Sequence, residues 1–113
     1  MDKALAQKVI DRLSSAKSPA LFTHLRPDGD AFGSLLGLAH ALRERGQTPS
    51  LHVEGGMIPM YRFLPGSDLI QDIPDQLPAK ADSFVVLDTS TRERVGRKTV
   101  DWKQPVDVVI DHH

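Results

Sequence analysis

Cysteine is absent from the 113 residues, which excludes disulfide bonds and thiolate metal sites. Aromatic residues are few, and Tyr61 and Trp102 are too isolated in the sequence to predict a base-stacking platform for single-stranded nucleic acid. No apolar stretch approaches the roughly 20 residues that a membrane-spanning helix needs. The first four residues also lack the apolar segment of a secretory signal. We therefore expect a cytoplasmic protein that does not contact a membrane.

A net charge of large magnitude is also lacking. The chain carries 14 basic and 15 acidic residues, for a formal net charge of -1, so no global field attracts nucleic acid. Any phosphate-binding surface must therefore be local, or a metal ion must supply it. The hydrophobic content of 40% and charged content of 26% are typical of a soluble globular protein. This length fits a single domain, residues 1–113.

Apolar periodicity predicts helices and strands in alternation. Residues 5, 9 and 13 form one apolar helix face, and residues 35, 38, 39 and 42 form another. Short apolar runs predict five strands, over residues 20–23, 51–53, 69–70, 83–87 and 106–110. Two of these runs are continuously aliphatic, which is typical of parallel strands buried on both faces. We expect an α/β fold, doubly wound, with a mainly parallel sheet and helices on both faces.

A polar turn between the first strand and the second long helix carries an imidazole and two carboxylates, those of His24, Asp28 and Asp30. Pro27 fixes its own φ and Gly29 permits a positive φ, so we expect these two residues to shape the turn. Open α/β sheets bind their ligands at the carboxyl ends of strands, where this turn lies. Carboxylates two residues apart repel each other unless a cation lies between them, and histidine is a ready third ligand.

Two later strands also end in residues of the types that bind metals. Asp88 follows the strand over residues 83–87, and Asp111, His112 and His113 follow the last one. Each has a plain alternative, because an aspartate after a strand is often only a turn or capping residue and a terminal triplet is often an exposed tail. Since parallel strands bring their carboxyl ends to one edge, three strands that end in this way favour a shared site.

Arg92, Arg94, Arg97 and Lys98 form a basic run after Asp88. A solvated face is the first interpretation, because long basic side chains are usually exposed. The alternative is a patch that steers phosphate toward the mouth of the site. Arg26 lies inside the polar turn and either contacts a substrate or occupies a plain turn position.

Three motifs, in this order, resemble those of the DHH phosphoesterases. They are His24-Leu25-Arg26-Pro27-Asp28-Gly29-Asp30-Ala31-Phe32-Gly33-Ser34, Leu87-Asp88-Thr89-Ser90 and Asp111-His112-His113. The resemblance covers nearly the whole chain. Within the family it is strongest to the bifunctional oligoribonucleases, or nanoRNases, that also dephosphorylate 3′-phosphoadenosine 5′-phosphate.

The resemblance implies a site for two metal ions, usually manganese, with magnesium as the alternative. His24, Asp28 and Asp88 would hold one ion. Asp30, Asp88 and His112 would hold the other, so that Asp88 bridges the pair. Two ions about 3.5–4 Å apart activate a bridging water and neutralise charge on the scissile phosphate. Mixed imidazole and carboxylate ligands suit manganese better than magnesium, which prefers oxygen ligands in an octahedron.

The resemblance also implies the remaining roles. Asp111 and His113 would be the catalytic residues: Asp111 would orient the adjacent histidine, and His113 would face the phosphate. His113 would therefore also bind the substrate. Apart from the resemblance, Arg26 is a further candidate for substrate binding, and a homodimer is a candidate assembly. Family members carry a fourth motif with another aspartate ligand and a second, substrate-gripping domain beyond the third motif. We therefore expect residues 1–113 to be a partial DHH catalytic domain, and a poor enzyme when alone.

The resemblance implies hydrolysis of a phosphoester by water, without a covalent enzyme intermediate. Short RNA oligonucleotides and 3′-phosphoadenosine 5′-phosphate are the first substrates to consider. Alternatives within the family are a cyclic-dinucleotide phosphodiesterase, a RecJ-type single-strand exonuclease and a manganese pyrophosphatase. An alternative of another class is a regulatory module that holds one magnesium ion, as phospho-receiver domains do. The histidines at the strand ends count against that last alternative.

Overall fold

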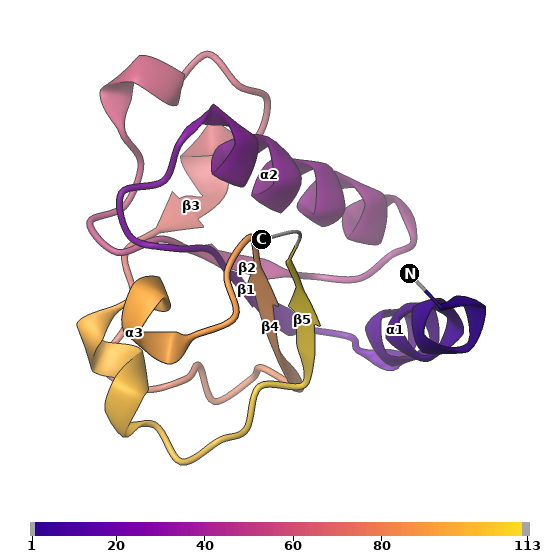
Figure 1. Ribbon diagram of the computed structural model, residues 1–113. Coiled ribbons are helices and arrows are strands. Elements are labelled where there is room, and N and C mark those ends of the chain that lie inside the picture. The colour runs from indigo at the N-terminus through magenta and orange to yellow at the C-terminus, as the bar shows by residue number, and fades with distance from the viewer. Residues whose placement is uncertain (1, 112–113) are drawn as a thin grey trace.

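The computed structural model describes residues 2–111, which form a five-stranded sheet with helices on both faces (Figure 1). All neighbouring strands are parallel, and their order is β3-β2-β1-β4-β5. The strands are β1 (Pro19–Phe22), β2 (Ser50–His52), β3 (Ile70–Gln71), β4 (Ser83–Leu87) and β5 (Val108–Ile110). The predicted doubly wound α/β fold is confirmed. The order reverses between β1 and β4, because the chain builds outward from β1 to β3 and then returns to the other side of β1.

Helices of unequal length cover the two faces of the sheet. The elements are α1 (Lys3–Ser15), α2 (Gly29–Glu44), α3 (Arg92–Val95), and the 3-10 helices η1 (Pro59–Tyr61), η2 (Ser67–Leu69) and η3 (Arg97–Asp101). Figure 1 shows α2 and α3 on opposite sides of the sheet. Helices α1 and α2 pack on one face, and α3 and η3 with the neighbouring loops cover the other. No helix within residues 2–111 combines the length and apolar character needed to cross a membrane.

Alternating side chains of the central strands build two separate cores. Leu21 and Val85 belong to the core beneath α1 and α2, whereas Phe22, Phe84 and Val86 belong to the core beneath α3 and η3. Every residue of β1 and β4 is buried, as expected for parallel strands that helices cover on both faces. The two central strands are therefore fixed by packing from both sides, and so are the residues that follow them.

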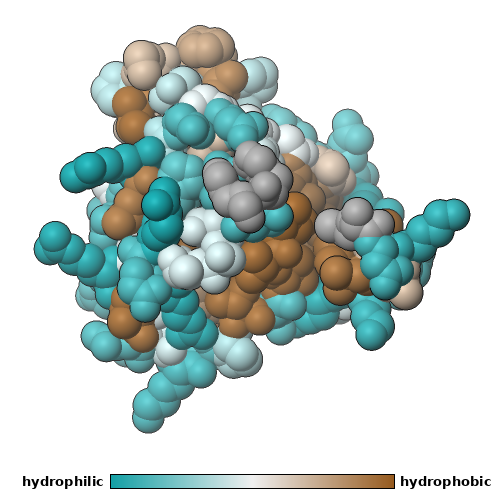
Figure 2. Space-filling model, in the orientation of Figure 1, coloured by the Kyte–Doolittle hydropathy of each residue, from teal (hydrophilic) through white to brown (hydrophobic). Residues whose placement is uncertain are grey.

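The edge of the sheet formed by β5 is less well covered than the central strands. Strand β5 pairs with β4 alone among the described strands, and Val109 is 42% exposed. Figure 2 shows apolar surface around β4 and β5, extending toward α1. The residues described here thus leave part of this edge without a covering element.

The turn between β1 and α2 differs from the sequence prediction in one respect. Gly29 does not adopt a positive φ; it begins α2, where the Tyr61 ring lies 3.5 Å from the point that a Cβ would occupy. Arg26 supplies the left-handed conformation instead, with a φ of 50°. The prediction that Gly29 bends the turn through a positive φ is therefore wrong, because the bend occurs before Pro27 and the helix has already started at Gly29.

His52 gives the fold a dependence on pH. It ends β2 as a buried residue that stacks on Phe22, with ring centroids 4.8 Å apart, and its Nε2 lies 2.9 Å from the Ser50 hydroxyl. Burial lowers the pKa of His52, and the backbone carbonyl of Asp72 only partly offsets this effect. The neutral ring therefore stabilises the folded state above the unfolded pKa of about 6.5, and this stabilisation is lost as the pH falls through the lower folded-state pKa.

We expect His52→Gln to reduce this pH dependence. Its free energy of unfolding should be lower than that of the wild type at pH 7.5, because the ring stacking is lost. The further decrease between pH 7.5 and pH 5.5 should be smaller in the variant, because no buried imidazole has to take up a proton. Urea unfolding at the two pH values measures both quantities. An equal decrease in variant and wild type would contradict the assignment.

Candidate metal centre

The centre lies where the strand order of the sheet reverses. Open α/β sheets bind ligands beyond the carboxyl ends of the strands at this point, here the ends of β1 and β4. His24 comes two residues after β1, and Asp88 follows β4 directly. The Thr23 hydroxyl donates a hydrogen bond of 2.9 Å to the Leu87 carbonyl and so joins the two strand ends. Parallel pairing thus brings together two residues that are 64 positions apart.

His24 and Asp88 form a buried pair. The imidazole Nε2 lies 3.1 Å from Oδ2 of Asp88, and the residues are only 7% and 5% exposed. The other ring nitrogen, Nδ1, lies 2.7 Å from the Leu25 carbonyl. A carbonyl only accepts hydrogen bonds, so Nδ1 carries the proton. In a neutral ring, Nε2 therefore presents a lone pair toward a carboxylate oxygen, which is favourable only when a proton or a metal cation lies between them.

This geometry matches that of metal ligands. Histidines that bind metals commonly donate the other ring N–H to a backbone carbonyl, which fixes the ring orientation. Two ligand atoms at right angles, each about 2.1 Å from one ion, lie roughly 3 Å apart. The separation between Nε2 of His24 and the Asp88 oxygen agrees with that value. The pair is therefore already arranged as two adjacent ligands of one cation.

Asp28 completes a group of three. One ligand atom from each of His24, Asp28 and Asp88 lies within 4.8 Å of the others. Asp28 also caps α2, because its Oδ1 accepts a hydrogen bond of 2.9 Å from the Ala31 N–H. The helix start therefore orients this exposed carboxylate toward the buried pair. One imidazole nitrogen and two carboxylate oxygens form a ligand set suited to a divalent transition metal.

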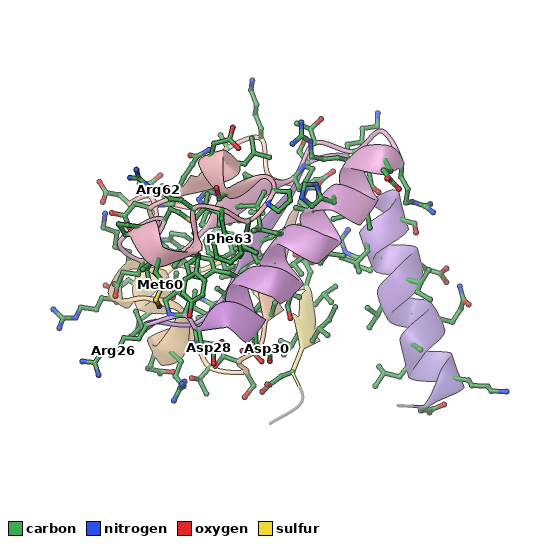
Figure 3. The ribbon with its side chains drawn as sticks, turned by 90° about the horizontal axis from the view of Figure 1, so that it is seen from above. Arg26, Asp28, Asp30, Met60, Arg62 and Phe63 are labelled. Carbon is green, nitrogen blue, oxygen red and sulfur yellow. The ribbon has the colours of Figure 1, made fainter. Side chains whose placement is uncertain are left out.

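Of the other predicted ligands and catalytic residues, the structure describes Asp30 and Asp111. Asp30 lies exposed in the first turn of α2, close to Asp28 (Figure 3), but outside the group of three. Asp111 is half-buried and lines the same cavity as Asp88, with a volume of about 240 Å³. The Asp88 N–H donates a 2.8 Å hydrogen bond to the Ile110 carbonyl and so keeps Asp111 near this edge. His112 and His113 lie outside the described residues, so the second ligand set stays a prediction.

Two residues at this centre, Arg26 and Asp88, have left-handed backbone conformations. Asp88 has a φ of 64° and Arg26 a φ of 50°, and no other non-glycine residue of the described chain has a positive φ. Such conformations cost free energy in residues with a Cβ and concentrate at functional sites. At Asp88 the conformation turns the chain away from β4 directly after the strand. The sequence offered no signal for either residue, since the local turn depends on the fold.

The basic run divides into two parts. The Arg92 guanidinium donates hydrogen bonds to the carbonyls of Thr99, Trp102 and Gln104 and lies 5.4 Å from the centre of the Phe84 ring. The prediction of a solvated face is therefore wrong for Arg92, which holds η3 and the following loop together. The remaining arginines of the run, Arg94 and Arg97, are exposed and line clefts that they share with Arg26.

The fold and this centre define a class: a doubly wound α/β protein with carboxylates and an imidazole, a candidate metal centre, at the switch point of its sheet. Residues 20–113 match the family described as the DHH family, N-terminal domain. The chain belongs to the DHH family. Its second motif supplies Asp88 and its first supplies His24 and Asp28.

Relatives and a solved structure agree with this placement. The chain is 35% identical over 106 residues to the bifunctional oligoribonuclease and PAP phosphatase NrnA of Thermus thermophilus, a match that covers 93% of this chain and 31% of the relative. It is 30% identical over 109 residues to the protein of the same name from Bacillus subtilis, which covers 94% of this chain and 32% of that protein. The chain thus spans about a third of the length of these relatives.

The solved structure is that of an exopolyphosphatase-related protein from Bacteroides fragilis. Its TM-score is 0.79 at 28% sequence identity, and the match covers 100% of this chain and 37% of the other. The resemblance therefore extends over the whole α/β fold, including the edge of the sheet that carries the candidate centre.

Substitution of Asp28 tests its helix cap and its candidate ligand role separately. Asparagine caps a helix about as well as aspartate, whereas alanine loses about 1 kcal/mol. We expect Asp28→Asn to unfold at the wild-type temperature in EDTA but to bind Mn²⁺, used as the probe, at least roughly tenfold more weakly. Asp28→Ala should lose both stability and metal affinity. Calorimetric titration and thermal unfolding measure the two effects.

Asp2 offers a matched control, because its carboxylate caps α1 by accepting a 2.9 Å hydrogen bond from the Ala4 N–H. Asp2→Asn should change neither the unfolding temperature nor the metal affinity. Wild-type Mn²⁺ affinity in Asp28→Asn would show that Asp28 is a helix cap and no more.

Proposed function

We propose that residues 1–113 are the metal-binding part of a manganese-dependent phosphoesterase that hydrolyses short RNA oligonucleotides, 3′-phosphoadenosine 5′-phosphate or both. The observation that carries this proposal is the buried pair in which Nε2 of His24 faces the Asp88 carboxylate, with Asp28 close by. The names of the two relatives support the substrate class. Their greater length supports the view that gripping the substrate needs residues outside this segment.

In this proposal each ligand has a defined role. His24, Asp28 and Asp88 would hold one ion, and Asp30, Asp88 and His112 would hold the other, so that Asp88 would serve both. The ligand set mixes nitrogen and oxygen, which favours manganese over magnesium. When bound, the ions would lower the pKa of a water molecule and neutralise charge on the scissile phosphate.

The chain itself contributes orientation and burial. The Leu25 carbonyl fixes the His24 ring through Nδ1, and the Ile110 carbonyl holds the backbone of Asp88. Because both side chains are buried, little water competes with them for a bound cation. We propose that Asp111 orients His112 and that His113 faces the phosphate. Water attacks directly, so no residue forms a covalent bond with the substrate.

Removal of Asp88 tests the shared ligand. We expect Asp88→Ala to lose both ions and all hydrolysis, since one carboxylate serves both positions. Elemental analysis of purified protein counts the metals. Hydrolysis is assayed on a 5′-phosphorylated RNA dinucleotide, 3′-phosphoadenosine 5′-phosphate, a cyclic dinucleotide and pyrophosphate, with Mn²⁺ and with Mg²⁺. Full metal content in Asp88→Ala would contradict the bridging role.

The same panel decides the substrate class. The full-length protein that contains these residues should hydrolyse the dinucleotide or the bisphosphate fastest, and residues 1–113 alone should bind metal but turn over far more slowly. Positioning of the substrate supplies on the order of 7–11 kcal/mol of such a barrier, and most of it would be missing in the short chain. Hydrolysis of pyrophosphate alone would favour the pyrophosphatase alternative, and hydrolysis of none would contradict the proposed function.

His113 is expected to act on the phosphate rather than on the metals. His113→Ala should keep the metal content of the wild type and lose most of the turnover number, because an interaction made only in the transition state lowers kcat. His112→Ala is the matched control, and it should lose metal. The reverse result, with metal lost in His113→Ala and kept in His112→Ala, would exchange the two assignments.

A further inference from the structure

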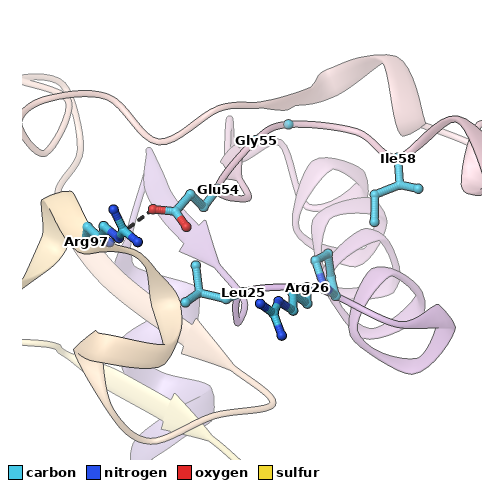
Figure 4. Close-up of a pocket in the computed structure, with 8 residues that line it drawn as sticks. Leu25, Arg26, Glu54, Gly55, Ile58 and Arg97 are labelled. Carbon is cyan, nitrogen blue, oxygen red and sulfur yellow. Dashed lines mark hydrogen bonds between the residues drawn. The ribbon is translucent and has the colours of Figure 1, made fainter.

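Three neighbouring clefts share lining residues, and the first of them lies at the candidate metal centre. The first, of about 240 Å³, is lined by Asp88 and Arg94 among others, and the second, of about 310 Å³, by Arg94, Leu25 and Arg26. The third and largest, of about 490 Å³, again includes Leu25 and Arg26 and reaches Arg97 (Figure 4). Each neighbouring pair of clefts shares an arginine. A surface of three arginines therefore leads from Asp88 toward Arg97.

The side chains of Arg94, Arg26 and Arg97 differ from the structural arginines of the chain. Arg92 binds carbonyl groups, and Arg12 binds both the Asp82 carbonyl and the Asp107 carboxylate. Within residues 2–111 the structure shows no hydrogen bond or ion pair of the guanidinium groups of the three cleft arginines, and all three residues are exposed. Guanidinium groups bind phosphate oxygens through paired, charge-assisted hydrogen bonds.

The backbone holds these arginines in place from three separate segments. Arg26 lies in the β1–α2 turn with its left-handed φ, and the neighbouring Leu25 N–H donates a hydrogen bond to the Arg94 carbonyl of α3. The Arg97 N–H, at the start of η3, donates to the Glu54 carboxylate at 3.1 Å. Glu54 is the one acidic residue that lines the largest cleft, and this backbone N–H already occupies one of its oxygens. The three segments are thus linked to the fold rather than free to separate.

We infer that Arg94, Arg26 and Arg97 form an arginine track that binds the phosphate groups of the substrate that are not cleaved, in this order from the metal centre. The inference rests on the proposed function, in which the scissile phosphate lies at the metals. The ligand class is a nucleotide or short oligonucleotide with at least two phosphates. Because the chain has a net charge of -1, the attraction is confined to this series of clefts and suits a short ligand.

A titration without metal tests the arginine track independently of hydrolysis. The chain, labelled with ¹⁵N and kept in EDTA, is titrated with a 5′-phosphorylated diadenylate and separately with adenosine, while NMR records backbone amide and arginine Nε–H signals. We expect the diadenylate to shift the signals of Arg26, Arg94 and Arg97, and adenosine to leave them in place. Arg26→Gln and Arg97→Gln should each raise the Kd of the diadenylate roughly fivefold or more.

Arg43 in the last turn of α2 is the matched control, since it is exposed and lines none of the three clefts. Arg43→Gln should keep the wild-type Kd. Equal affinities in wild type and Arg26→Gln, or an equal loss in Arg43→Gln, would overturn the arginine track. The titration contains no metal and therefore measures binding alone. Binding through the arginine track without hydrolysis in the separate assay would contradict the proposed function but not the track. Hydrolysis with unchanged affinities in the arginine variants would contradict the track alone.

Discussion

The pairing of β1 with β4 is the constraint on which the candidate centre depends. It places the His24 imidazole 3.1 Å from the Asp88 carboxylate, in a position where both groups are almost fully buried. Two buried polar groups of this kind are costly unless a shared proton or cation satisfies them. The hydrogen bond between the Thr23 hydroxyl and the Leu87 carbonyl holds the strand ends at this separation. A shift of one residue in the register between β1 and β4 would separate the imidazole of His24 from the carboxylate of Asp88.

The two hydrophobic cores fix this pairing from opposite sides. Leu21 and Val85 pack beneath α1 and α2, and Phe22 and Phe84 pack beneath α3 and η3, so neither strand can rotate without exposing an apolar face. The same packing fixes the start of α2, which Asp28 caps, and the short helix α3, which carries Arg94. The core thereby determines the positions of the candidate metal ligands and of Arg94.

Residues of one chemical type serve different purposes in this chain. Arg92 stabilises the loop after η3 by donating to backbone carbonyls, whereas Arg94, two residues later, lines the cleft beside Asp88. In the same way, Asp28 is both a helix cap and a candidate ligand, whereas Asp2 is only a cap. A single exposed carboxylate is therefore both a helix cap and a candidate ligand, and asparagine at that position keeps the cap while it changes the candidate ligand.

The sequence by itself determined the class of the fold and the motifs at the ends of its strands. Buried aliphatic runs such as 83–87 specify a parallel sheet because apolar burial on both faces leaves few alternatives, and His24, Asp28 and Asp88 follow from local patterns. Only the tertiary structure decided which groups meet. Packing against the sheet, rather than local preference, decides the left-handed conformations of Arg26 and Asp88. It also decides that α3 and η3 form within a stretch whose sequence is polar and basic. The strand order that brings Asp88 to His24 likewise arises from contacts between residues far apart in the chain, which no short segment of the sequence encodes.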